Sequence, residues 1–148
     1  MTDPTKLKDQ LVAISREAGA AILNIYSRDF QSAQKSDRSP VTEADTAAEA
    51  LIIAALAKVA PGIPVIAEEQ CAANGLPPDA PERFFLVDPL DGTKEFIARN
   101  GEFTVNIALV ENGRPVLGVV YLPAFNACYA GAAGAAERRV GENGPERI

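Results

Sequence analysis

Two helix-like patterns precede every strand-like pattern in this 148-residue chain, and this order constrains its fold more than any other feature of the sequence. Thr2-Asp3-Pro4 is typical of a helix start, because a capping side chain is followed by proline near the first helical position. Apolar residues then recur at helical spacing from Leu7 to Ile25. The pattern predicts one amphipathic helix that ends near Tyr26–Arg28.

A second helix is predicted after a polar loop over Gln31–Pro40. Thr42 resembles its cap, and Asp45 is expected in its first turn, where the helix dipole favours an acid. Apolar residues over 48–59 supply its buried face, and Pro61-Gly62 is a stop signal.

Short apolar runs of strand type follow the second helix. Glu111-Asn112-Gly113-Arg114 joins two of them, and Asn-Gly between strands is a strong hairpin signal. Phe84–Val87 is apolar throughout, which predicts a strand buried on both faces. The further predicted strands are Pro64–Ala67, Thr104–Val110, Val116–Leu122 and Ala127–Ala130. A short helix is predicted at Lys94–Arg99 and a surface loop at Cys71–Arg83. The tail at 131–148 has no apolar periodicity. Helices followed by a mixed sheet predict an α+β fold.

Composition excludes several classes of chemistry. The chain has no histidine, so it has no Ser-His-Asp triad and no histidine metal ligand. It has no tryptophan and a net charge of −6, which argues against binding to a nucleic acid polymer. Cys71 and Cys128 are too few for a disulfide framework, and the longest apolar stretch is too short for a transmembrane segment. We expect a cytoplasmic protein, with peripheral association at the cytoplasmic face of the inner membrane as an alternative.

Acidic residues stand where two predicted strands end. Glu68 and Glu69 follow one strand, and Asp88 and Asp91 follow another. Carboxylate and carbonyl oxygens are ligands that suit Mg²⁺, and the Leu90 carbonyl offers a further one. The alternative is a capped turn with acids that only face solvent.

Gly92-Thr93 follows these acids and opens the predicted short helix. Backbone amides at such a point can bind an anion, and glycine allows a phosphate to approach the backbone closely. Acids for a metal beside amides for a phosphate are what metal-dependent phosphoryl hydrolysis requires. Thr93 can also be read as a helix cap alone.

Three motifs resemble one known family. Asp88-Pro-Leu-Asp91-Gly-Thr93 is similar to the DPxDGT signature of the inositol monophosphatase superfamily, whose members are magnesium-dependent, lithium-sensitive phosphatases. Ser39-Pro-Val-Thr-Glu-Ala-Asp45 resembles the upstream PVTxAD element, and Ala67-Glu68-Glu69 resembles the acidic pair of that family. The segment from Gly92 to Ala108 is similar to the branch of 3′(2′),5′-bisphosphate nucleotidases. The resemblance extends from the first helix to about Gly131.

The resemblance implies the metal ligands. Glu68, Asp88 and the Leu90 carbonyl would bind one Mg²⁺, and Asp88 and Asp91 would help to bind a second. Glu69 would assist a third, weaker metal or its water. Two or three Mg²⁺ ions are therefore expected in a complete enzyme, with Li⁺ as an inhibitor.

The resemblance also implies the substrate contacts. The backbone amides of Gly92 and Thr93 would hold the scissile phosphate, and Asp45 would hydrogen-bond the Thr93 hydroxyl to orient the attacking water. The residues that would line the substrate site are Glu68, Leu90, Asp91, Gly92 and Thr93.

The implied activity is Mg²⁺-dependent hydrolysis of a phosphomonoester by metal-activated water. The expected substrate is adenosine 3′,5′-bisphosphate, which would yield AMP and phosphate. Two alternatives are an inositol-1-monophosphatase-like and a fructose-1,6-bisphosphatase-like activity. A third, of another class, is a catalytically incomplete fragment that only binds metal.

Members of this family are normally much longer than 148 residues. Their C-terminal half supplies an aspartate, next to a tryptophan, that completes the second metal site. We therefore expect residues 1–148 to form a single N-terminal metal-site domain, with the C-terminal half absent. Two helices would pack on a mixed sheet, as in the N-terminal part of a layered αβαβα sugar-phosphatase-like fold, and leave an apolar face or edge exposed. Besides a small phosphorylated substrate, the expected partners are a second copy in a homodimer or a complementing C-terminal chain.

Overall fold

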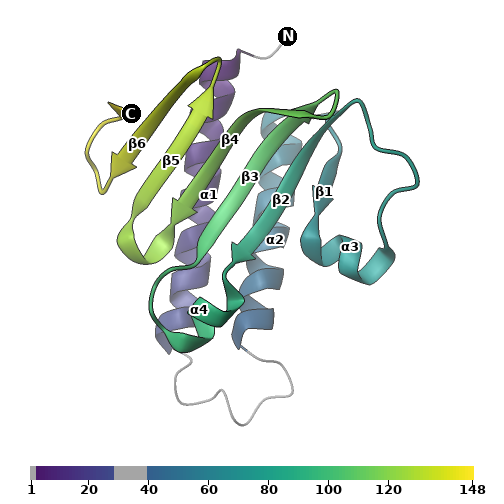
Figure 1. The fold of residues 1–148 in the computed structure, drawn as a ribbon. Coiled ribbons are helices and arrows are strands. Elements are labelled where there is room, and N and C mark those ends of the chain that lie inside the picture. The colour runs from purple at the N-terminus through teal and green to yellow at the C-terminus, as the bar shows by residue number, and fades with distance from the viewer. Residues whose placement is uncertain (1–2, 29–39) are drawn as a thin grey trace.

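The computed structural model describes residues 3–28 and 40–148 (Figure 1). Its helices are α1 (Pro4–Arg28), α2 (Pro40–Val59), α3 (Glu68–Asn74), α4 (Thr93–Ala98) and the 3₁₀ turn η1 (Pro123–Phe125). Its strands are β1 (Val65–Ala67), β2 (Arg83–Asp91), β3 (Thr104–Glu111), β4 (Arg114–Leu122), β5 (Ala127–Ala132), β6 (Ala135–Val140) and β7 (Glu146–Arg147).

The seven strands form one sheet in the order of the chain. β1 pairs with β2 in parallel, and every later pair is antiparallel. The predicted hairpin joins β3 to β4, and Asn112 and Gly113 both take the positive φ that a tight turn of this kind requires, at 52° and 80°. The α+β architecture is confirmed.

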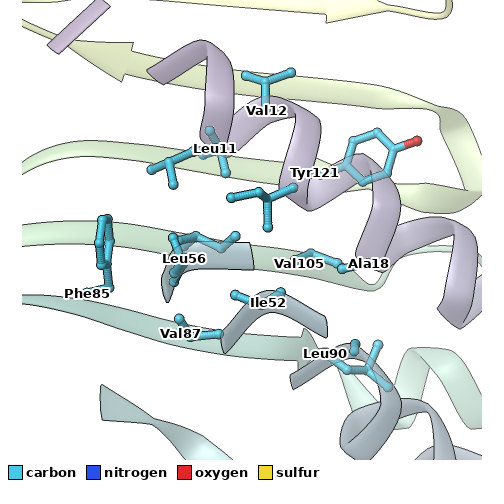
Figure 2. Close-up of a cluster of buried hydrophobic side chains, with 14 of the residues drawn as sticks. Leu11, Val12, Ala18, Ile52, Leu56, Phe85, Val87, Leu90, Val105 and Tyr121 are labelled. Atoms are coloured by element: carbon cyan, nitrogen blue, oxygen red, sulfur yellow. The ribbon is translucent and has the colours of Figure 1, made fainter. Parts of the chain in front are cut away.

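α1 and α2 lie side by side on one face of the sheet (Figure 1). Their apolar stripes meet the inward side chains of β2, β3 and β4 in one core, in which Leu11, Ile52 and Phe85 have no exposed surface (Figure 2). Asp3 caps α1, since its Oδ1 accepts the N–H of Thr5 at 3.0 Å. α2 begins at Pro40, so the prediction that Thr42 is its cap is wrong; Asp45 lies in the second turn and Glu43 is the acid of the first.

The prediction that Phe84–Val87 is buried on both faces is wrong. Leu86 is 49% exposed, because both long helices pack on the same face and, within the described residues, nothing covers the other. The apolar face expected from the sequence is present there, and the register places on it the exposed side chains of Leu86, Val116, Val120, Tyr129 and Val140.

Two segments predicted to lack regular structure are ordered. The predicted loop at Cys71–Arg83 begins inside α3, which continues to Asn74 and ends at Gly75 with a φ of 80°. The polar tail extends β5 and forms β6 and β7. Two ion pairs tie β6 to α1, because Glu137 contacts Lys8 and Arg139 contacts Asp9 at 2.6 Å. No described helix is long and apolar enough to cross a membrane.

Gly19 lies where α1 packs closely against Tyr121 on β4 and against Pro123. A Cβ at this position would lie 2.9 Å from Cδ2 of Tyr121 on β4 and 3.1 Å from Cγ of Pro123. Such contacts are too short for carbon atoms, so the helix can pack at this distance only with glycine.

We predict that Gly19→Ala lowers the free energy of unfolding by about 1–3 kcal/mol, because overpacking outweighs the better helix propensity of alanine. Urea unfolding followed by circular dichroism measures the change. In a Tyr121→Leu background, where the ring is gone, the same substitution should cost less. An increase in stability on Gly19→Ala alone would contradict the packing argument.

Candidate active site

The candidate site begins where β1 ends beside β2. Parallel pairing sets Ala67 opposite Val87, so Glu68, which follows β1, and Asp88, which lies within β2, stand at the same level. Their carboxyl groups are close enough to interact. Two acids twenty residues apart in the sequence are thereby brought together, although Asp88 and Asp91, which were predicted to follow the strand, lie within β2.

A bulge in β2 separates Asp88 from Asp91. Asp88 stands opposite Asn106 on β3, but Asp91 stands opposite Thr104, so the register shifts between the two acids. Asp88 Oδ1 accepts the Leu90 N–H at 3.3 Å, and the Leu90 side chain is buried at 2% exposure. The bulge therefore turns the backbone so that Leu90 packs inward while Asp91 remains exposed.

Asn106 is a residue that sequence reasoning missed. Its Nδ2 donates to Asp91 Oδ2 at 3.2 Å, which ties Asp91 to β3. Its Oδ1 is buried and has no hydrogen-bond partner in the structure. An amide inside the otherwise apolar β3 pattern was the available signal.

Gly92 connects the bulge to α4 and is the N-cap of that helix. Thr93 is the first helical residue, so its reading as a cap is wrong. Gly92 has a φ of 93°, and a Cβ there would lie 3.2 Å from the Glu102 carbonyl oxygen and 3.3 Å from Phe103 Cα. Only glycine fits this backbone conformation without strain.

An aromatic cluster holds α4 against the end of α1. The rings of Tyr26, Phe96 and Phe103 pack with centroids 5.1 to 5.3 Å apart. Arg99, which caps the C-terminus of α4, stacks 4.1 Å above the Tyr26 ring and donates to the Tyr26 carbonyl at 2.7 Å. These contacts anchor the helix that carries Thr93.

α2 contributes Asp45, which is 9% exposed. Burial, together with the charges of Glu69, Glu68, Asp88 and Glu49, raises the pKa of Asp45 to about 7. Burial and the neighbouring Glu68 carboxyl also raise the pKa of Asp88. Burial, followed by the charge of Glu49, raises the pKa of Glu69. The acids predicted from three separate motifs therefore form one electrostatic cluster.

Glu49 is the second residue that sequence reasoning missed. It lies one turn after Asp45 on α2, is 5% exposed, and accepts the N–H groups of Glu69 and Gln70 at 2.8 and 3.0 Å. An acid four residues after Asp45 on a helix face otherwise made of alanine and isoleucine was the signal for it. Of the upstream motif, Ser39 lies outside the described residues.

The donor set fits a divalent cation by its chemistry. The four neighbouring charges that raise the pKa of Asp45 are all carboxylates, and a cation would neutralise their repulsion. Across residues 3–28 and 40–148, no three acidic, cysteine or histidine side chains are already arranged to hold a metal ion. The acids are therefore gathered in one place without forming a ready metal site, and their like charges repel one another.

The chain matches the inositol monophosphatase family over residues 3–144. This match covers nearly all of its length, well past the Gly131 limit expected from the motifs, and the chain belongs to that family.

Among its relatives are proteins named 3′(2′),5′-bisphosphate nucleotidase CysQ. The one from Shigella flexneri is 49% identical over 135 residues, which are 86% of this chain and 52% of the relative. The crystal structure of CysQ from Bacteroides thetaiotaomicron superposes with a TM-score of 0.80 at 36% identity, over 97% of this chain and 57% of that one. Mycobacterium tuberculosis SuhB superposes with a TM-score of 0.79 at 26% identity, over 99% of this chain and 52% of that one. The chain thus spans about half the length of the curated relatives that it matches.

The raised pKa of Asp45 predicts how stability depends on pH without metal. The folded chain binds a proton more tightly than the unfolded chain, whose Asp45 has a pKa near 3.8. The free energy of unfolding should therefore fall as the pH rises from about 4 through about 7. Urea unfolding in EDTA at pH 5, 6, 7 and 8 measures this slope, and added Mg²⁺ should restore stability at pH 8.

Asp45→Asn should reduce the slope, because the substituted side chain does not titrate, whereas Asp88, whose pKa is also raised to about 7, still does. Asp79→Asn, in the exposed segment before β2, is the matched control and should leave the slope unchanged. An equal slope in the wild-type chain and in Asp45→Asn would show that Asp45 is not the group responsible.

Proposed function

We propose that this chain provides the metal- and phosphate-binding part of a Mg²⁺-dependent phosphomonoester hydrolase. The observation that carries the proposal is the convergence of Asp45, Glu68, Glu69 and Asp88 in one cluster at the ends of β1 and β2. These residues come from α2, α3 and β2, which are separate in the sequence. Acids that merely face solvent would not be expected to converge on one place in this way.

In this proposal, Glu68, Asp88 and the Leu90 carbonyl hold one Mg²⁺, and Asp88 and Asp91 take part in a second site. Asn106 supports Asp91 through the hydrogen bond at 3.2 Å. Glu69 assists a third, weaker ion or its water. Bound Mg²⁺ supplies positive charge and lowers the pKa of water near it. Two or three ions in a complete enzyme, and inhibition by Li⁺, are part of the proposal on family grounds.

The phosphate is proposed to lie against Gly92 and Thr93. Gly92 is the N-cap of α4, so its amide and that of Thr93 stand at the start of this helix, directly after Asp91. The Thr93 hydroxyl would donate to the Asp45 carboxylate and orient the attacking water. Burial of Asp45 in a cluster of acids supports its role as an acceptor that is deprotonated once a cation binds. Glu68, Leu90 and Asp91 would complete the wall around the substrate.

The proposed substrate is adenosine 3′,5′-bisphosphate, which would yield AMP and phosphate. The support is similarity to proteins named 3′(2′),5′-bisphosphate nucleotidase, at 49% identity for the Shigella flexneri protein. Inositol 1-phosphate and fructose 1,6-bisphosphate are the alternatives within the same family. Residues 1–148 are proposed to act as one domain, since a single apolar core joins the helices and the sheet.

A second candidate is a fragment that binds metal and turns nothing over. Two observations favour it: the chain spans about half of its relatives, and its described acids are not arranged in advance as a metal site. A complementing C-terminal chain or a homodimer partner would then be needed for activity.

Cys71 and Cys128 are free, which supports a cytoplasmic location.

The proposal is tested by phosphate release from adenosine 3′,5′-bisphosphate with Mg²⁺, using the 148-residue chain and the native protein that carries it. Asp88→Asn should reduce turnover by orders of magnitude without unfolding, because the remaining acids lose a charged ligand. Asp79→Asn should behave like the wild type. Unchanged turnover of Asp88→Asn at saturating Mg²⁺ would refute the assignment. Mg²⁺ binding without any phosphate release would favour the metal-binding fragment.

Thr93→Ala should lower turnover by about 10²–10⁴-fold and leave Mg²⁺ affinity nearly unchanged, because the hydroxyl is proposed to position water and not metal. Steady-state kinetics and calorimetric titration measure the two effects separately. Thr93→Ser retains the hydroxyl and should keep most of the activity. If the alanine and serine variants behave alike, only the backbone amide of residue 93 matters.

A further inference from the structure

Glu49 is a buried carboxylate that lies outside the three family motifs. It projects from α2 to the N-terminus of α3, where both of its oxygens are used. Oε1 accepts the Glu69 N–H at 2.8 Å, and Oε2 accepts the Gln70 N–H at 3.0 Å. One side chain therefore binds two successive backbone amides of another helix.

α3 needs such a partner more than the other helices do. The first amides of a helix have no acceptor within the helix, and a side chain at the N-cap normally supplies one. Here the N-cap is Ala67, whose side chain has no hydrogen-bond acceptor, so it forms no side-chain cap. α3 has seven residues and buries none of them, so packing does little to hold it in place. The carboxylate of Glu49 is the cap of this helix.

The first turn of α3 also carries two candidate site residues. Glu68 and Glu69 begin the helix, so the direction of their side chains depends on where that turn lies. Like charges on Asp45 and Asp88 repel this pair, and Glu49 adds a further negative charge beside it. The Glu49 carboxylate adds to this repulsion, but its two hydrogen bonds to backbone amides hold the first turn of α3 in place against it.

We propose that Glu49 is a positioning residue for the metal site: by bonding the amides of Glu69 and Gln70, it holds the acidic pair where a divalent cation can join it to Asp88. The inference rests on the proposed function, since it assumes that this pair binds a cation. Glu49 itself does not contact the cation.

Two substitutions separate position from charge. Glu49→Asp keeps the charge but is one methylene shorter, so it cannot reach both amides. Glu49→Gln keeps the length but loses the charge and one of the two acceptors. Mn²⁺ is the probe, titrated calorimetrically into the 148-residue chain. Both variants should bind Mn²⁺ about 10–100-fold more weakly. Hydrogen exchange at the Glu69 and Gln70 amides should be faster in both.

Gly19→Ala is the matched control, because it is expected to lower stability through contacts with Tyr121 and Pro123 and not through α3. Its Mn²⁺ affinity should stay within about twofold of the wild type. If Gly19→Ala weakens Mn²⁺ binding as much as the Glu49 variants do, Glu49 acts only through general stability and the inference is overturned. Glu49→Asp binding like the wild type would mean that only charge matters, which also overturns it. If the wild-type chain binds no Mn²⁺, the proposed metal site itself is wrong; if the wild type and both Glu49 variants bind equally well, only the role of Glu49 is wrong.

Discussion

Parallel pairing of β1 with β2 is the constraint on which the candidate site depends. It brings Glu68, which follows β1, to the level of Asp88 in β2, at the same end of the sheet. An antiparallel pair would send them to opposite ends. Because β1 has only three residues, its own hydrogen bonds cannot hold this end firmly, and the neighbouring helices must contribute.

The acids at this end oppose their own assembly. Burial and mutual repulsion raise the pKa of Asp45 to about 7, so the cluster is poorly suited to carrying full negative charge without a cation. The contacts around it therefore restrain position. The β2 bulge separates Asp88 from Asp91, Asn106 binds Asp91, and the rings of Tyr26, Phe96 and Phe103 anchor α4.

The exposed face of the sheet is the other consequence of the helix-first order. Because α1 and α2 pack on the same face, the outward side chains of β2, β4, β5 and β6 include apolar residues such as Leu86 and Val120. These exposed apolar side chains agree with the finding that the chain spans about half the length of its relatives.

The sequence by itself determined the local elements and the chemistry of the site. Helical periodicity, the Asn112-Gly113 turn and the acids at strand ends each depend on neighbours a few residues away, so they could be read directly. Tertiary structure alone decided which strand faces meet the helices, and this is why the continuous apolar run at 84–87 proved exposed on one side. Tertiary structure also stabilised α3, whose cap Glu49 lies about twenty residues upstream. This helix could not be predicted, because a hydrogen bond between distant segments leaves no periodic pattern in the sequence.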